Sequence, residues 1–287
     1  MRAFAALIPL ALLATSPVQA LTQADKDDTP CQAGRAALEA GESTRAIALL
    51  ETCLASTDLE PDREVSVYAG LGAAFLAEQR FEEALNAYNF AFAIAETQQA
   101  EVIEPTLWRN RGIARAELGQ LDGALDDLQR AAAEMPDDVM THLTLGFVYQ
   151  DLDRPADAVV AYDSVVRLEP EWTGAWINRS SALLDAGMTS DAVEDARRAV
   201  ELEPDSGTTL NMLCWTLIKD GRARTALPLC EQAVALEPDS GAIVHSHASA
   251  LEALGRLDEA RPLYRRAWQL SPDDPEISAD YERTHNP

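Results

Sequence analysis

Lysine is almost absent from this chain of 287 residues, in which Lys26 and Lys219 are the only two. Lysine and arginine together number 23 against 48 aspartates and glutamates, which gives a formal net charge of −25. A field of that sign repels phosphate backbones and anionic lipid surfaces, so nucleic acid is excluded as an expected partner. The acidity indicates neutral or basic partners, or it serves only to keep a large surface soluble.

Aromatic residues are also scarce, at 6% of the chain, although apolar residues make up 47%. A core must therefore be built mainly from alanine and leucine. Helices packed closely together suit such a core best.

Motifs for catalysis and metal binding are missing. There is no Cys-x-x-Cys, no Gly-x-Ser-x-Gly and no glycine-rich phosphate loop. A zinc site needs three or four convergent ligands, and the only close histidine pair falls on different faces of a helix. We therefore expect no enzymatic activity, no cofactor and no metal at the four histidines, which are His142, His245, His247 and His285.

A long apolar run occurs only at the N-terminus. The run over 3–14 is too short, at roughly 12 residues, to span a bilayer of about 30 Å, and Val18-Gln19-Ala20 has the form of a secretory cleavage site. We expect a signal peptide at 1–20, a polar linker at 21–29 and a mature chain without direct membrane insertion. Cys31 lies eleven residues beyond Ala20, which disfavours a lipid-anchored cysteine. The expected destination is the bacterial periplasm, with secretion as the alternative.

The rest of the sequence repeats itself every 34 residues. Two residue types keep this period over five units, a proline that mostly stands in Leu-Glu-Pro and an alanine: Pro136, Pro170, Pro204, Pro238 and Pro272, with Ala124, Ala158, Ala192, Ala226 and Ala260. A small residue twelve positions before each alanine would let two antiparallel helices approach closely, namely Gly112, Gly146, Ser180, Cys214 and Ala248. Glycines midway can take the positive φ that ends a first helix, so each unit is predicted to be a helical hairpin.

These features resemble the tetratricopeptide repeat, whose pattern has an early aromatic, a Leu-Gly pair and a later aromatic. Trp108 and Trp176 occupy the early aromatic place, and Leu145-Gly146 and Tyr149 match the middle of the pattern. The resemblance implies an all-α, right-handed superhelix, or α-solenoid, of about seven repeats within 30–272. The expected units are 27–60, 65–98, 105–138, 139–172, 173–206, 207–240 and 241–274, followed by a capping helix and tail at 275–287.

The four cysteines are expected to pair because the chain is exported. Cys31 and Cys53 take the fifth and twenty-seventh places of the first unit, and Cys214 and Cys230 take the eighth and twenty-fourth places of another. Places with the same sum lie opposite each other in an antiparallel hairpin. This predicts Cys31–Cys53 and Cys214–Cys230, with buried free thiols as the alternative.

Stacked hairpins form a concave groove lined by the first helix of each unit, where a peptide can lie. The resemblance implies that the second, fifth, sixth, ninth and twelfth or thirteenth residues of each unit face this groove. The candidate partner-binding residues are Arg109, Asn110, Phe147, Gln150, Asn178, Asn211 and Trp215. Trp215 could equally be core, Arg109 could simply pair with a carboxylate, and the asparagines could be surface amides bonded to water.

Some relatives hold a peptide carboxylate with clustered lysines and arginines, and this lysine-poor chain departs from that pattern. The expected ligand is therefore a protein segment that is neutral to basic and partly apolar. The expected role is a non-enzymatic adaptor in the assembly or regulation of a cell-envelope complex. The alternatives are a self-associating spacer, which would form a homo-oligomer, and an enzyme with an unrecognised site.

Overall fold

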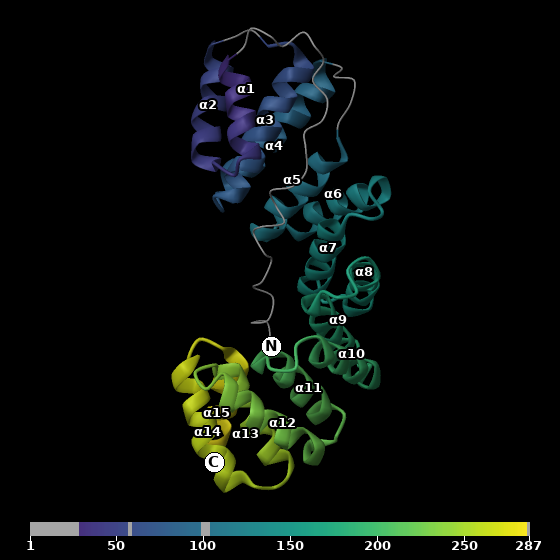
Figure 1. Cartoon of the computed structure of the whole chain (residues 1–287), viewed down its shortest axis with the longest axis vertical. Helices are drawn as coiled ribbons and strands as arrows, with labels where there is room; N and C mark the ends of the chain where they lie inside the picture. The colour runs from purple at the N-terminus through teal and green to yellow at the C-terminus, as the bar shows by residue number, and fades with distance from the viewer. Residues whose placement is uncertain (1–28, 57–58, 99–103, 286–287) are drawn as a thin grey trace. The chain divides into compact units, whose positions relative to one another are not determined.

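The structure is a computed structural model that describes residues 29–56, 59–98 and 104–285 (Figure 1). These residues form fifteen α-helices and no strand. The expected signal peptide, most of the expected linker and the last two residues lie outside the described ranges. The chain divides at Leu152 into two compact units, each described by itself below.

The first unit contains seven helices: α1 (Thr29–Glu39), α2 (Ser43–Ser56), α3 (Pro61–Ala77), α4 (Phe81–Gln98), α5 (Pro105–Glu117), α6 (Leu121–Glu134) and α7 (Val139–Asp151). The second contains α8 (Pro155–Leu168), α9 (Thr173–Asp185), α10 (Thr189–Leu202), α11 (Gly207–Lys219), α12 (Ala223–Leu236), α13 (Gly241–Ala253), α14 (Leu257–Leu270) and α15 (Pro275–His285). In both units, helices that follow each other pack as antiparallel hairpins, such as α5 with α6 and α11 with α12. The predicted all-α solenoid of helical hairpin repeats is confirmed.

Short connections with recurring chemistry separate the helices. The glycines expected to end first helices do adopt a positive φ, between 70° and 76°, at Gly119, Gly187, Gly221 and Gly255. At three of the repeating prolines, Pro136, Pro170 and Pro272, the carbonyl oxygen accepts a hydrogen bond from a side chain six residues further on. Trp176 Nε1 donates to Pro170 at 2.8 Å and Ser278 Oγ donates to Pro272 at 2.9 Å.

A close approach within the hairpins lies between the eighth residue of a repeat and the twenty-fourth, sixteen positions later. A Cβ added to Gly112 would come within 2.7 Å of Leu128, and one added to Gly72 would come within 2.5 Å of the Tyr88 ring. The Tyr88 side chain is fully buried. The small residues predicted to permit close helix packing are thus confined by the facing helix.

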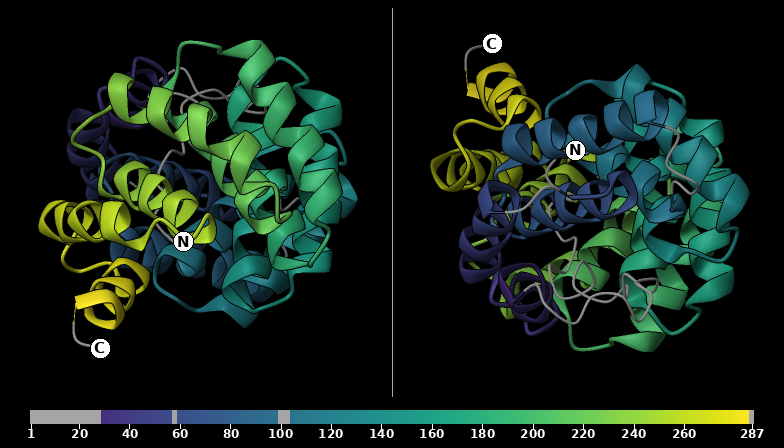
Figure 2. Two further views of the ribbon diagram at one scale, coloured as in Figure 1. Left: turned by 90° about the horizontal axis from the view of Figure 1, so that it is seen from below. Right: turned by 90° about the horizontal axis from the view of Figure 1, so that it is seen from above.

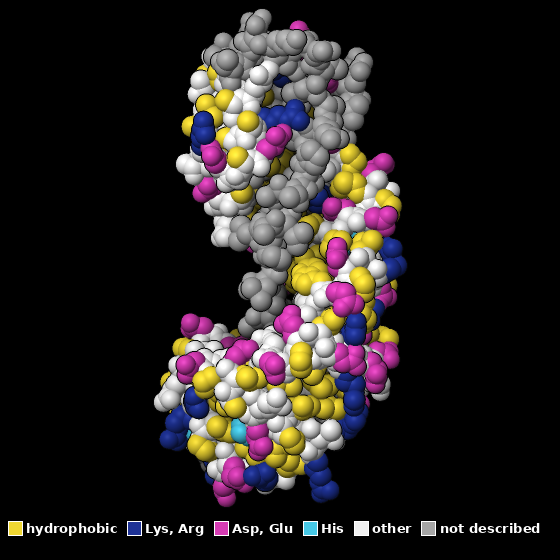
Figure 3. All heavy atoms as spheres, viewed as in Figure 1, with side chains coloured by type: hydrophobic (Ala, Val, Ile, Leu, Met, Phe, Trp, Pro, Cys, Tyr) yellow, Lys and Arg dark blue, Asp and Glu magenta, His cyan; other side chains and the backbone are white. Residues whose placement is uncertain are grey.

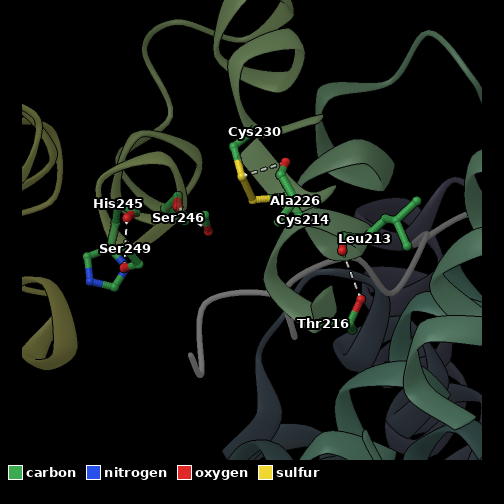
Figure 4. Close-up of a disulfide and its surroundings, with 9 residues drawn as sticks. Leu213, Cys214, Thr216, Ala226, Cys230, His245, Ser246 and Ser249 are labelled. Atoms are coloured by element: carbon green, nitrogen blue, oxygen red, sulfur yellow. Dashed lines mark hydrogen bonds between the residues drawn. A yellow bond between two sulfur atoms is a disulfide. The ribbon is translucent and has the colours of Figure 1, made fainter. Parts of the chain in front are cut away.

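At two places the hairpin is closed covalently. The structure joins Cys31 to Cys53, with their Cα atoms 5.0 Å apart, and Cys214 to Cys230, with their Cα atoms 5.4 Å apart (Figure 4). Cys214 and Cys230 occupy the eighth and twenty-fourth places, where other repeats place glycine against a large side chain. The two disulfide bonds pair the cysteines as predicted.

A buried ion pair recurs one residue earlier in two repeats. Arg111 makes two hydrogen bonds of 2.8 Å to Asp127, and Arg179 makes two of 2.7 Å to Asp195. Burial raises the pKa of Asp195, and the hydrogen bonds from Arg179 oppose this increase. The seventh and twenty-third places therefore hold a salt bridge across the hairpin, which the sequence analysis did not identify.

The second hairpin is longer than the others. Helix α3 has 17 residues and begins at Pro61, four residues before the expected start of its unit, and α4 has 18 residues. The corresponding helices of the third hairpin have 13 and 14 residues. Residues 61–64, which lie between the first two expected units, thus lengthen α3.

The Gly72→Ala substitution is expected to destabilise the first unit by about 1–3 kcal/mol, because the new methyl group would overlap the buried Tyr88 ring. The intrinsic helix preference of alanine over glycine, about 1 kcal/mol, acts in the opposite direction. Urea unfolding followed by circular dichroism measures the difference. Gly123→Ala is the matched control, since its methyl group would meet only the flexible Arg115 side chain, and an equal loss in both variants would contradict the packing argument.

Replacing Cys214 and Cys230 together by alanine is expected to destabilise the second unit by roughly 3 kcal/mol, because a bridge of this loop length restricts the unfolded chain. Chemical unfolding with and without a reductant measures this effect. The parent should lose stability on reduction and the double variant should not respond at this site. Equal midpoints for the oxidised parent and the variant would show that the bond contributes nothing.

Candidate functional site

The first helices of successive hairpins form one layer in each unit. In the first unit α3 contacts α5 and α5 contacts α7; in the second, α9, α11, α13 and α15 contact one another in order. The second helices α10 and α12 instead contact the first helix of the next hairpin. We call these contacting first helices of each unit the first-helix layer. They carry all seven candidate partner-binding residues.

In the first unit, Arg109 is buried and fully engaged. Its Nη1 donates to Asp138 at 3.0 Å and its Nε donates to the Asn110 side-chain oxygen at 3.0 Å. Asp138 also caps α7 by accepting from the Thr141 backbone N–H at 2.9 Å. Arg109 thus pairs with a carboxylate, which was the alternative to partner binding in the sequence analysis. It also orients the half-buried Asn110.

Three further candidates are partly accessible. Phe147 and Gln150, both on α7 of the first unit, are half-buried, and so is Asn178 on α9 of the second. Asn178 lies one position before Arg179, whose side chain crosses to α10. These side chains have the accessibility that direct contact with a partner requires.

Asn211 and Trp215 are less accessible than a groove site would suggest. The Trp215 side chain is 6% exposed, its ring centroid is 5.9 Å from that of His245, and the Lys219 ammonium lies 4.1 Å from the indole centroid. Asn211, one helical turn before Trp215, is fully buried, and neither its side-chain oxygen nor its nitrogen has a hydrogen-bond partner. A buried amide without partners costs about 1–3 kcal/mol, which makes Asn211 the most unusual polar group of the layer.

Helices α11 and α13 of the second unit carry few charges compared with the connections between hairpins. Helix α11 carries Lys219 as its only charged residue, and α13 carries Glu252 as its only acidic or basic one besides its histidines. In contrast, each of the five connections between hairpins from 135–138 to 271–274 contains two carboxylates and no lysine or arginine. On the face shown in Figure 3, basic side chains of the second unit lie beside acidic ones, with hydrophobic side chains between them.

Among the described residues, no group of three or more histidine, cysteine or carboxylate side chains is placed to hold a metal ion. No helix within 29–56, 59–98 or 104–285 combines the length and apolarity needed to cross a bilayer. The two disulfide bonds are compatible with an exported protein.

A polar network at the C-terminal end of the layer was missed from the sequence. It joins His245 and Glu252 of α13 to Asp280 and Arg283 of α15. The sequence did contain a signal for it, because Pro275 lies 34 residues after Gly241 and so marks the start of another first helix. The sequence analysis interpreted this segment only as a cap.

Comparison with known proteins identifies the repeat. Two family models described as tetratricopeptide repeat match residues 31–95 and 173–282. The curated protein FlbA from Caulobacter vibrioides is 31% identical over 104 residues, which are 36% of this chain and only 17% of FlbA. The chain thus spans less than a fifth of that relative.

Solved structures of similar fold include a tetratricopeptide repeat protein from Parabacteroides merdae, with a TM-score of 0.65, 15% identity and coverage of 90% of this chain and 98% of that one. A thermophilic protein of the same repeat type from Thermus thermophilus has a TM-score of 0.52 and 23% identity, covering 63% of this chain and 98% of that one. At these identities the likeness shows the fold alone.

This repeat is typically a non-catalytic scaffold for protein–protein interaction. The 34-residue period, the hairpins with their first-helix layer and both family matches agree. The chain belongs to the tetratricopeptide repeat family.

Proposed function

We propose that this protein is an exported, non-enzymatic adaptor that binds an extended segment of another protein along its first-helix layer. Its role is in the assembly or regulation of a cell-envelope complex, and its compartment is the bacterial periplasm. The residues proposed to touch a partner are Asn178, Asn211 and Trp215 in the second unit. In the first unit they are Asn110, Phe147 and Gln150, with Arg109 orienting Asn110.

The observation that carries this proposal is the buried Asn211 amide, which lacks partners for both its nitrogen and its oxygen. A peptide group offers one N–H and one C=O, so a chain lying across α11 could satisfy both atoms of the side chain. Reaching Asn211 requires a small displacement of the side chains around it. The free energy of the unpaired amide then favours the bound state.

The chemistry of α11 and α13 supports a partner segment that is neutral to basic and partly apolar. Trp215 offers a large apolar surface of the kind enriched in binding hot spots. These helices carry few charges, and the acidic connections at the edge of the layer would attract basic residues flanking the bound segment. An acidic segment would be repelled by the same connections.

Asn211→Leu is expected to raise the free energy of unfolding of the second unit by about 1 kcal/mol or more, since it replaces an unpaired buried amide by an apolar side chain of similar size. The same substitution should weaken partner binding. Thermal unfolding and a binding titration on one preparation measure both effects. A less stable variant with unchanged binding would show that Asn211 is only part of the core.

The double variant Asn178→Ala, Asn211→Ala is expected to bind the partner segment at least tenfold more weakly, about 1.4 kcal/mol, because both amides would contact its backbone. The segment is first identified by photo-crosslinking from position 178 in an envelope extract. Its affinity for the parent and the variants is then measured by calorimetry with a synthetic peptide.

Asn86→Ala is the matched control, because Asn86 is an exposed asparagine on the second helix α4. Equal affinities for the parent and the double variant would contradict the first-helix layer as the site. Crosslinks only to further copies of this chain, with a size that depends on concentration, would favour the self-associating spacer instead.

A further inference from the structure

Helix α15 takes the place of a first helix in the repeat register. It begins at Pro275, which lies 34 residues after Gly241 at the start of α13, and it contacts both α13 and α14. Figures 1 and 2 show these three helices side by side at the C-terminal end. Its side chains therefore extend the first-helix layer beyond α13.

Ionic hydrogen bonds join α15 to the last complete hairpin. His245 Nε2 lies 2.9 Å from an Asp280 carboxylate oxygen, and because an ionised carboxylate only accepts, Nε2 is the protonated nitrogen. Arg283 donates to Asp280 at 2.8 Å and to both Glu252 oxygens at 2.6 and 2.9 Å. The Tyr264 hydroxyl of α14 donates to Glu252 at 2.5 Å.

The solvent exposure of this network increases from His245 to Arg283. His245 is 2% exposed, and its ring lies between those of Trp215 and Tyr264, with centroids at 5.9 and 5.6 Å. The Arg283 side chain is 53% exposed and stands two residues before the end of the helix. The network thus connects a buried imidazole to an accessible guanidinium near the end of the chain.

The rest of α15 is held by few apolar contacts. Ile277 is buried in a small cluster with Val244 and Ala267, and the Tyr281 ring stacks on Trp268 with centroids 4.8 Å apart. Eleven residues are too few for an isolated helix to be stable in water. The C-terminal half of α15 is therefore held by the Tyr281–Trp268 stack together with its ionic partners.

We propose that α15 is an acid-released latch, which detaches when Glu252 and Asp280 become protonated and thereby uncovers His245 and the end of the first-helix layer. Protonation removes the charge of both acceptors that hold Arg283. It also leaves His245 facing a carboxylic acid. All four ionic partners are lost or weakened together, so the release is cooperative.

Charged and titratable groups face the network from four helices. They are Lys219 above Trp215 on α11, His245 and Glu252 on α13, Tyr264 on α14, and Asp280 and Arg283 on α15. The Arg283 hydrogen bonds lower the pKa of Glu252, and the His245 hydrogen bond, followed by that of Arg283, lowers the pKa of Asp280.

These directions fix the pH range of the release. A carboxylate whose pKa is depressed in the folded state contributes stability that is complete above its ordinary pKa, about 3.9 for aspartate and 4.3 for glutamate. That contribution is lost as the pH falls through the folded-state values. The latch is therefore closed at pH 7, and its ionic stabilisation begins to weaken below about pH 4 and is lost as the pH falls further.

The test is hydrogen exchange of the α15 amides in the full chain, corrected for the intrinsic exchange rate at each pH. The Glu252→Gln, Asp280→Asn double variant mimics the protonated state without a change of pH. At pH 7 it should lower the protection of α15 at least tenfold and leave α9 to α12 unchanged, and the parent should lose protection of α15 progressively as the pH is lowered below about 4. Glu259→Gln is the control, since it removes an exposed ion pair with Arg256 on α14.

Two results would overturn the latch. Undiminished protection of α15 in the double variant would show that Ile277 and the Tyr281–Trp268 stack hold the helix without the ionic network. An equal loss of protection in α9 to α12 would show that the network stabilises the whole unit rather than one helix. Neither measurement requires a bound partner, so the latch can fail while the adaptor function stands.

Discussion

The close approach of two antiparallel helices at the eighth and twenty-fourth places of the repeat is the constraint on which the rest of this structure depends. A glycine there lets the facing Leu128 or Tyr88 side chain pack directly against the helix backbone, and Cys214 with Cys230 replaces that packing by a covalent bond. Because each hairpin is thin and largely built from alanine, it cannot bury an apolar face alone and must stack on the next one. The 34-residue period follows from this requirement.

Stacking divides the polar residues of the second unit between two regions. The helices α11 and α13 lie between neighbours and therefore carry few charges, whereas the short connections reach solvent and hold pairs of carboxylates. Charges that are buried across a hairpin come as bidentate pairs, such as Arg179 with Asp195. Helices α11 and α13 of this acidic protein thus carry almost no net charge.

Asn211 differs from the buried ion pairs, because its buried polar atoms have no hydrogen-bond partners. Asp127 and Asp195 have their hydrogen bonds supplied within the hairpin, but the Asn211 amide has none, although it is fully buried. Such a group lowers stability unless another molecule completes it. The C-terminal network is the opposite case, because Glu252, Asp280 and Arg283 all have hydrogen-bond partners, and α15, which supplies two of them, is short.

The sequence by itself determined the repeat, the hairpins, the family and the cysteine pairs, because each of these follows from the spacing of residues within 34 positions. Packing between repeats decided which side chains of the first helices are buried and which groups they contact. Trp215 and Asn211 are buried although their places suggested a groove, and Arg109 is engaged by Asp138 from the next hairpin. The His245–Asp280 pair also joins different repeats. One repeat specifies its own hairpin through local spacing, but the exposure and partners of its outer side chains depend on which neighbour stacks against it.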